Sequence, residues 1–337
     1  MLHAIILAAV TASLTPAQVD SIVTNAEKAF KTYIFPDVAE KAVAMLKTHT
    51  TSYEKISDPK ELRSTVNRDL LMVTHDKHVS LWYPFDPRSE GNAPADKAAA
   101  HHGELLDNFG FESVRRLPGN VGYVQFSYFS SDPGVGQAIE ATMSFLANTD
   151  ALIIDLRHNA GGDPIAAETI EGYFFDSQQQ ITSLMWRDPK TGVVQEIQQN
   201  TAPTVPGPLY LKKPIYVLTS SHTFSCAEQF VYDLQNLKRI TIVGSTTGGG
   251  ANPGGVDDLG NSFGIFMPQG RAYSPVTKTN WEGTGIAPDI AVPAKEALAK
   301  AYAIALGYVK RHNSNSDVQG EITQALSNPQ KALSQTP

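Results

Sequence analysis

Hydrophobic and polar positions divide the chain into a helical first part and a second part in which strands and helices alternate. Between residues 15 and 75, apolar residues recur at spacings of three and four, the period of an amphipathic helix. Thr15 followed by Pro16 is typical of a helix start. The pattern predicts three helices, the third over about residues 58–74. We therefore expect residues 15–83 to form a small N-terminal helical domain.

Residues 84–118 lack sustained periodicity and contain proline, glycine and charge, which predicts a connector with one short helix. Beyond it, short apolar runs typical of buried strands alternate with helical stretches. This alternation predicts an α/β core over residues 119–310, with a mostly parallel sheet covered on both faces. The polar residues 311–337 are predicted to be a tail with one loose helix. The expected strands are 121–128, 151–156, 214–219, 240–243 and 263–267, and the expected helices are 134–146, 164–175, 226–237 and 296–309.

The N-terminus holds the one membrane-like stretch of the sequence, Ala4–Val10, which continues to Leu14. It is too short to span a bilayer, which takes about 20 apolar residues, so no integral membrane segment is expected. Small residues at Ala12 and Ser13 fit the cleavage region of a signal peptide over residues 1–14, although no Lys or Arg precedes the stretch. The alternative is the start of a buried helix. We expect a secreted or periplasmic protein, with a cytoplasmic location as the alternative.

Charge and cysteine content exclude several classes of function. Acidic residues outnumber basic ones by 34 to 27, giving a net charge of −7, which argues against a nucleic-acid-binding surface. A single cysteine, Cys226, excludes an internal disulfide framework and a Cys-rich zinc site. The spacings of zinc-protease, dinucleotide-binding and P-loop motifs are absent. We therefore expect neither a metal nor a cofactor.

A strand-turn-helix junction at residues 218–228 carries a candidate nucleophile, Ser225. A hydroxyl at a helix N-terminus faces unsatisfied N–H groups, which expose it and stabilise an anion formed there. The alternative is structural, because Ser225 with Glu228 three residues later also fits a capping box.

Two glycines follow the predicted strand at residues 151–156. The run Asp155–Pro164 includes Gly161 and Gly162, and such a pair allows backbone N–H groups to converge on a small anion, as an oxyanion hole requires. The same glycines would equally serve a tight turn between strand and helix.

Two further segments offer the partners of a serine nucleophile. His78 follows the third predicted helix in Asp76-Lys77-His78, and Glu282 lies among glycines beside Trp281. A lone histidine is commonly a structural or surface residue, and Glu282 also fits a solvated turn.

Taken together and in this order, these segments resemble the tail-specific (C-terminal processing) serine protease family. The similarity covers about residues 14–308 and is strongest with the branch of tricorn protease and the repeats of interphotoreceptor retinoid-binding protein. The matching stretches are 33–37, 76–78, 155–162, 219–228 and 282–290.

The resemblance implies a crotonase-like or ClpP-like α/β core with an N-terminal helical cap. It also implies that no PDZ domain is inserted, since only about 40 residues separate His78 from Val121. Members with a Ser–Lys dyad place a lysine where this chain has Gly244–Gly250, a stretch without lysine. The residues present permit a Ser–His–Glu arrangement instead.

Carried over residue by residue, the resemblance implies that Ser225 is the nucleophile, His78 the general base and Glu282 the acid that orients the imidazole. Backbone N–H groups of Gly161 or Gly162 and of Cys226 would form the oxyanion hole. The expected function is a serine peptidase that cleaves a peptide or protein substrate through an acyl-enzyme.

Three alternatives stay open from the sequence. His222, three residues before Ser225, could replace His78 as the base. The Cys226 thiol could act as the nucleophile, because a helix N-terminus lowers a thiol pKa. The same fold could instead bind apolar ligands of the retinoid or fatty-acid type without catalysis.

Overall fold

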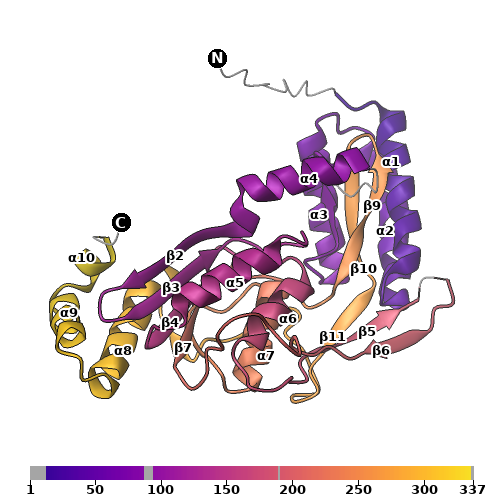
Figure 1. Cartoon of the computed structure of the whole chain (residues 1–337). Coiled ribbons are helices and arrows are strands. Elements are labelled where there is room, and N and C mark those ends of the chain that lie inside the picture. Colours follow the sequence, from indigo (N-terminus) through magenta and orange to yellow (C-terminus); the bar gives the residue numbers. More distant parts are fainter. Residues whose placement is uncertain (1–12, 87–93, 189, 335–337) are drawn as a thin grey trace. The chain divides into compact units, whose positions relative to one another are not determined.

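The structure, a computed structural model, describes residues 13–86, 94–188 and 190–334. The chain forms two compact units (Figure 1). Unit 1 comprises the described residues up to 86 together with 186–194 and 253–270, and unit 2 comprises the remainder.

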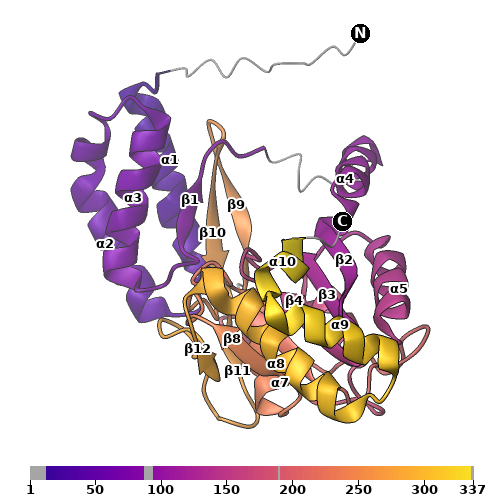
Figure 2. The same ribbon diagram turned by 90° about the vertical axis from the view of Figure 1, so that its left-hand side faces the viewer.

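Three helices of unit 1 confirm the pattern of the first part of the sequence. They are α1 Pro16–Ala29, α2 Pro36–Tyr53 and α3 Pro59–Thr74. Each begins with a proline, whose missing N–H would have no partner there anyway. Thr15 caps α1 in a capping box with Gln18, as the Thr15-Pro16 pair predicts. The helices pack side by side around buried aliphatic and aromatic residues (Figure 2).

A three-stranded antiparallel sheet completes unit 1. Its strands are β1 Ser80–Trp82, β10 Phe263–Pro268 and β9 Gly254–Gly260, with β10 in the middle. The expected strand at 263–267 is therefore present, and it belongs to this sheet rather than to the parallel one. Phe263, Ile265 and Met267 are buried against the helices, whereas Gly264 and Phe266 face the other side of the strand.

Unit 2 contains the mostly parallel sheet that the alternation of strands and helices predicts. Its six strands have the order β12-β8-β7-β4-β3-β2, with every pair parallel except β2–β3. The strands are β2 Phe111–Leu117, β3 Val121–Phe126, β4 Ala151–Asp155, β7 Ile215–Thr219, β8 Thr241–Gly244 and β12 Ile290–Ala291.

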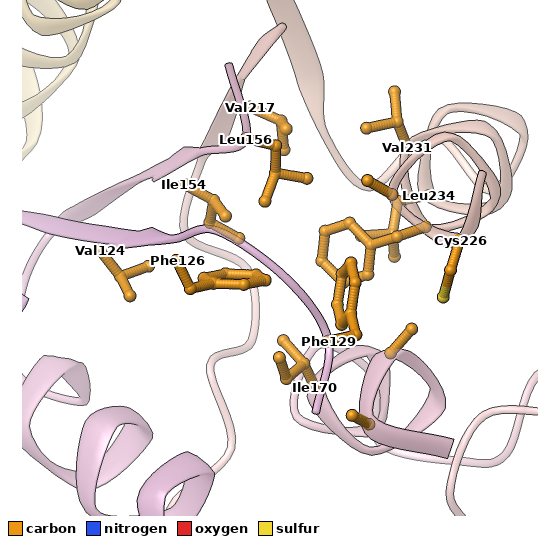
Figure 3. Packing of buried hydrophobic residues seen from close by; sticks show 14 of the residues in the cluster. Val124, Phe126, Phe129, Ile154, Leu156, Ile170, Val217, Cys226, Val231 and Leu234 are labelled. Carbon is orange, nitrogen blue, oxygen red and sulfur yellow. The ribbon is translucent and has the colours of Figure 1, made fainter. Parts of the chain in front are cut away.

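Helices cover both faces of this sheet because successive strand residues point in opposite directions. On β4, Leu152 and Ile154 pack into one hydrophobic cluster with α5, α6 and α7, and Ile153 packs into another with α8 and α9 (Figures 2 and 3). The helices are α4 Pro94–Leu106, α5 Val135–Leu146, α6 Pro164–Gly172, α7 Cys226–Asn236, α8 Ala297–His312, α9 Ser316–Ser327 and α10 Pro329–Ser334.

The polar C-terminal residues hold more structure than the single loose helix that their composition suggests. They form α9 and α10, and Ile322 and Ala325 of α9 are buried in the cluster on one face of the sheet. The segment 84–118 likewise contains the edge strand β2 besides its helix α4. Strands β11 Gly270–Tyr273, β5 Ser183–Arg187 and β6 Val194–Ile197 form a further small sheet that the pattern does not indicate.

Within the part of the chain that the structure describes, every helix is too short or too polar to cross a membrane. The membrane-like stretch at residues 4–10 lies outside the described residues, as does most of the expected signal peptide.

Candidate active site

Ser225 lies at the end of the turn that connects strand β7 to helix α7, directly before the first residue of the helix. The turn is fixed by side-chain hydrogen bonds rather than by apolar packing alone. The Thr223 hydroxyl donates to the carbonyl of Leu156 (2.8 Å) and accepts from the N–H of Ser220 (3.0 Å). The N–H of Phe224 donates to the carbonyl of Asn159 (3.1 Å). These bonds join the turn to the segment that follows β4, so the serine and the glycine run are held together.

The backbone of Ser225 differs from that of an ordinary N-cap. An N-cap residue has extended dihedral angles, whereas Ser225 has φ 54° and ψ −125°. This region is costly for a residue with a side chain, by about 1–3 kcal/mol, and such strain concentrates at functional sites. A serine on a strained strand-to-helix turn is also the geometry of the nucleophile in the α/β hydrolases. Capping by itself does not require this conformation.

Gly161 approaches Ser225 so closely that no other residue fits. A Cβ atom built on Gly161 would lie 2.8 Å from the Cβ of Ser225 and 3.0 Å from the N of Cys226. Gly161 also has a φ of 111°, which residues with a side chain rarely adopt. Its N–H donates to the Asn159 side chain (2.9 Å). Gly162 forms a parallel bridge to Phe129 that uses the carbonyl of Gly161 and the N–H of Asp163, not its own N–H.

Glu228 connects the serine to a glycine loop distant in sequence. Its side chain is fully buried, and its Oε2 accepts from the N–H of Ser225 (3.1 Å) and of Gly250 (2.8 Å). Its Oε1 accepts from the N–H of Gly249 (2.6 Å) and from the Thr247 hydroxyl. Burial raises the pKa of Glu228, and the four hydrogen bonds oppose that rise. The capping contact predicted from the sequence is therefore present, but it is one of four.

Glu282 is attached to the same loop. Its Oε2 accepts from the N–H of Ala251 (2.6 Å), the residue after Gly250. The neighbouring Trp281 is buried, and its indole N–H donates to the carbonyl of Gly250 (2.8 Å). Ser225 and Glu282, which are far apart in sequence, thus belong to one hydrogen-bonded network in unit 2, linked through Glu228 and residues 249–251.

The side chain of Cys226 points into the apolar core of unit 2. It belongs to the same buried hydrophobic cluster as Phe129 and Ile170, between the sheet and α6 and α7 (Figure 3). Burial, reinforced by Glu171 and other acids nearby, raises the pKa of this thiol well above its usual range. A buried thiol of raised pKa is a poor nucleophile. This environment does not favour the cysteine as the reactive residue.

His78 lies in unit 1, just after α3. His75 ends that helix in the left-handed conformation (φ 53°), and the chain then turns toward β1. The imidazole of His78 is buried and stacks on Phe266 of β10, with ring centroids 5.4 Å apart. Burial lowers the pKa of His78 to about 4, although the nearby Asp76 carboxylate acts in the opposite direction. His78 is therefore neutral at pH 7, the protonation state that a general base requires.

The rival histidine, His222, has an exposed side chain, and its N–H donates to the Ser220 hydroxyl (3.0 Å). Sequence reasoning missed the wider role of Glu228 and the part of Asn159, which positions the Gly161 segment. Asn159 stands inside the quoted run 155–162, but nothing local distinguishes its buried amide from an ordinary turn residue.

Residues 120–292 match peptidase family S41, and residues 8–107 match the N-terminal domain of that family in eukaryotic interphotoreceptor retinoid-binding protein. The chain belongs to peptidase family S41. This confirms the resemblance to C-terminal processing serine proteases that the sequence motifs indicate, together with the α/β fold class. Ser225 and the Gly161–Gly162 pair fall in the first match, and His78 falls in the second.

A carboxy-terminal-processing protease of Bartonella bacilliformis is 28% identical over 214 residues, or 61% of this chain and 45% of that protein. The chain thus spans less than half the length of this relative. Two solved structures share the fold. A lipoprotein from Streptococcus agalactiae has a TM-score of 0.55 at 15% identity, covering 86% of this chain and 96% of that one. A Parabacteroides merdae structure assigned as a peptidase has a TM-score of 0.53 at 22% identity, covering 77% of this chain and 88% of that one.

Proposed function

We propose that this protein hydrolyses peptide bonds through an acyl-enzyme formed on Ser225. The observation that carries the proposal is the strained backbone of Ser225 at the start of α7, with the backbone of Gly161 packed directly against it. A structural cap has no need of that strain, whereas a nucleophile on a sharp turn does.

The N–H groups near Ser225 suit a tetrahedral oxyanion. Cys226 is the first residue of α7, and the first N–H groups of a helix have no acceptor within the helix. Gly162 does not use its own N–H in its bridge to Phe129. We assign the oxyanion hole to these two donors. The N–H of Gly161 serves a different purpose, since it donates to Asn159 and fixes the turn.

In the proposed reaction His78 accepts the proton of the Ser225 hydroxyl as the oxygen attacks the substrate carbonyl. The resulting imidazolium later donates that proton to the leaving amine, and water then hydrolyses the ester. Glu282 orients the imidazole and stabilises its positive charge. The substrate is a peptide or protein, and the name of the Bartonella relative supports a C-terminal segment as the site of cleavage. We also propose that the protein is exported from the cytoplasm, in which case N-terminal sequencing of the mature protein should show that the expected signal peptide has been removed.

A fluorophosphonate probe tests the nucleophile directly, because it reacts with activated serines and its adduct is located by mass spectrometry. We expect stoichiometric labelling at Ser225 and no labelling or peptidase activity in Ser225→Ala. Labelling at another residue, or full activity of Ser225→Ala, would refute the proposal.

The base is tested by two matched histidine substitutions. His78→Ala should abolish labelling, whereas His222→Ala should label as the wild type does. The opposite result would transfer the role of base to His222. Iodoacetamide provides the control for Cys226, since a buried thiol of raised pKa should remain unmodified in the folded protein.

A further inference from the structure

The turn that carries His78 holds a second buried side chain with catalytic potential. Asp76 exposes 2% of its surface, and a carboxylate buried to that degree requires hydrogen-bond donors. Its Oδ2 accepts from the hydroxyl of Tyr33 (3.1 Å), and its Oδ1 accepts from the N–H of His78 (2.9 Å). The same Oδ1 lies 3.8 Å from Nδ1 of the His78 ring. One carboxylate therefore holds the backbone of the histidine and faces its ring.

We propose that Asp76 is a positioning residue for the His78 base, and that its carboxylate stabilises the positive charge that the imidazole acquires on taking a proton. The inference rests on the proposed function, in which His78 deprotonates Ser225. It adds a second acid to the one already proposed, Glu282. The role of Asp76 is indirect, because it acts on the imidazole and not on the substrate.

The burial of His78 is the effect that a nearby carboxylate offsets. The ring is buried and stacks on Phe266 of β10. Burial makes the imidazole a weak base, with a pKa of about 4, and Asp76 opposes that effect. Because the Asp76 and His78 side chains are both buried, the charge acts on the ring with little screening.

Tyr33 fixes the orientation of the Asp76 carboxylate. Its hydroxyl donates to Oδ2, which leaves Oδ1 directed at His78. Tyr33 exposes 1% of its surface, and its ring packs edge-on against Phe30 and Phe35, so its hydroxyl has a defined position. The carboxylate is therefore ordered before any substrate arrives.

Unit 1 contains a matched control for this arrangement. Asp69 also accepts from a tyrosine hydroxyl, that of Tyr53 (2.7 Å), and also faces a histidine, with Oδ2 3.2 Å from Nδ1 of His49. It lies on α3 and takes no part in the proposed reaction. Asp69→Asn therefore measures what the loss of one acid from a Tyr–Asp–His trio does to the fold alone.

The experiment compares Asp76→Asn, Asp76→Glu and Asp69→Asn in the full chain. Asp76→Asn keeps an oxygen that can accept from the His78 N–H but removes the charge. We expect its kcat at pH 7 to fall about tenfold to a hundredfold with KM nearly unchanged. Asp76→Glu should recover part of this loss, and Asp69→Asn should behave as the wild type.

A titration gives a second readout that a purely structural role would not change. In the inactive Ser225→Ala background, NMR should show that His78 takes up its proton at a lower pH when Asp76→Asn is added. The acidic limb of the kcat/KM profile should move in the same direction, because the unprotonated imidazole then persists to lower pH. Asp69→Asn should leave both midpoints in place.

Three results would overturn the inference: an unchanged His78 titration in Asp76→Asn, a wild-type kcat in that variant, or an equal loss in Asp69→Asn. If Asp76→Asn fails to fold, Tyr33→Phe decides, because it keeps the charge and removes one hydrogen bond. Its kcat should stay within about threefold of the wild type, and a loss of a hundredfold would contradict a role based on charge. An active Ser225→Ala would instead refute the proposed function itself.

Discussion

Replacing Glu228 by glutamine is the substitution that tests the site network most sharply. The wild-type carboxylate accepts four hydrogen bonds, two at each oxygen, and is fully buried. Glutamine has nearly the same shape but replaces one accepting oxygen with an NH₂ group, which only donates. Two of the four donors then face another donor.

The structure indicates which orientation the glutamine would adopt. With its NH₂ at the Oε1 position, it could donate to the Thr247 hydroxyl, which is able to turn and accept, while the N–H of Gly249 loses its partner. The opposite orientation would leave two N–H groups, those of Ser225 and Gly250, without an acceptor. A buried N–H without an acceptor costs about 1–3 kcal/mol, and neutral acceptors are weaker than charged ones. We expect a loss of about 2–4 kcal/mol in the free energy of unfolding.

The same change should reduce the reactivity of Ser225. Weaker support at the Ser225 N–H allows its strained backbone to relax toward an ordinary helix start. A cost of 1.4 kcal/mol corresponds to a factor of ten, so fluorophosphonate labelling should slow by about tenfold to a hundredfold. Urea unfolding, followed by tryptophan fluorescence, and labelling rates by intact mass measure the two effects.

Glu168→Gln is the control, because Glu168 is also a glutamate of unit 2 but is only partly buried and accepts one side-chain hydrogen bond, from Gln199. Its stability should change by less than about 1 kcal/mol, because a single side-chain hydrogen bond is altered. An unfolding free energy of Glu228→Gln within 1 kcal/mol of the wild type, together with unchanged labelling, would refute the reasoning.

Three further outcomes are expected. Gly161→Ala should slow fluorophosphonate labelling of Ser225 at least about a hundredfold, because the new Cβ would lie 2.8 Å from the Cβ of Ser225. The control is Gly136→Ala, at a helical glycine with open space around it, which should label at the wild-type rate. Burial raises the pKa of Asp233 to about 7, so the folded state resists its ionisation and the free energy of unfolding falls as pH rises toward 7. Asp233→Asn lacks this loss. Between pH 5 and 8, urea unfolding should therefore show the variant becoming about 2–3 kcal/mol more stable relative to the wild type. The pKa of His78 is lowered to about 4 in the folded protein, so as pH falls the unfolded chain takes up the His78 proton before the folded state does. Relative to His78→Gln, the free energy of unfolding of the wild type should therefore fall by about 3 kcal/mol between pH 6.5 and 4.

Much of the fold can be predicted from the sequence, because the signals for helices and buried strands lie in neighbouring residues. The start of α1 was predicted at Thr15 and Pro16, and α3 was predicted within a residue of its observed start at Pro59. The parallel sheet followed from apolar runs separated by helices. Strand β2 was missed because its residues Phe111–Leu117 include three charged positions and only its ends are buried. Its identity as a strand comes from pairing with β3, not from its own pattern.

The reactive groups can be identified from the sequence alone: a serine at a helix start, two glycines after a buried strand, a histidine after a helix and a glutamate among glycines. These are short-range features, recorded in neighbouring residues. The hydrogen-bond partners of these groups follow from the fold instead. Glu228 reads locally as a cap for Ser225, yet three of its four donors come from a loop about 20 residues away. Asp76 pairs with Tyr33, which is 43 residues distant. Such pairings depend on burial, because a polar group removed from water takes whichever partner the fold brings to it.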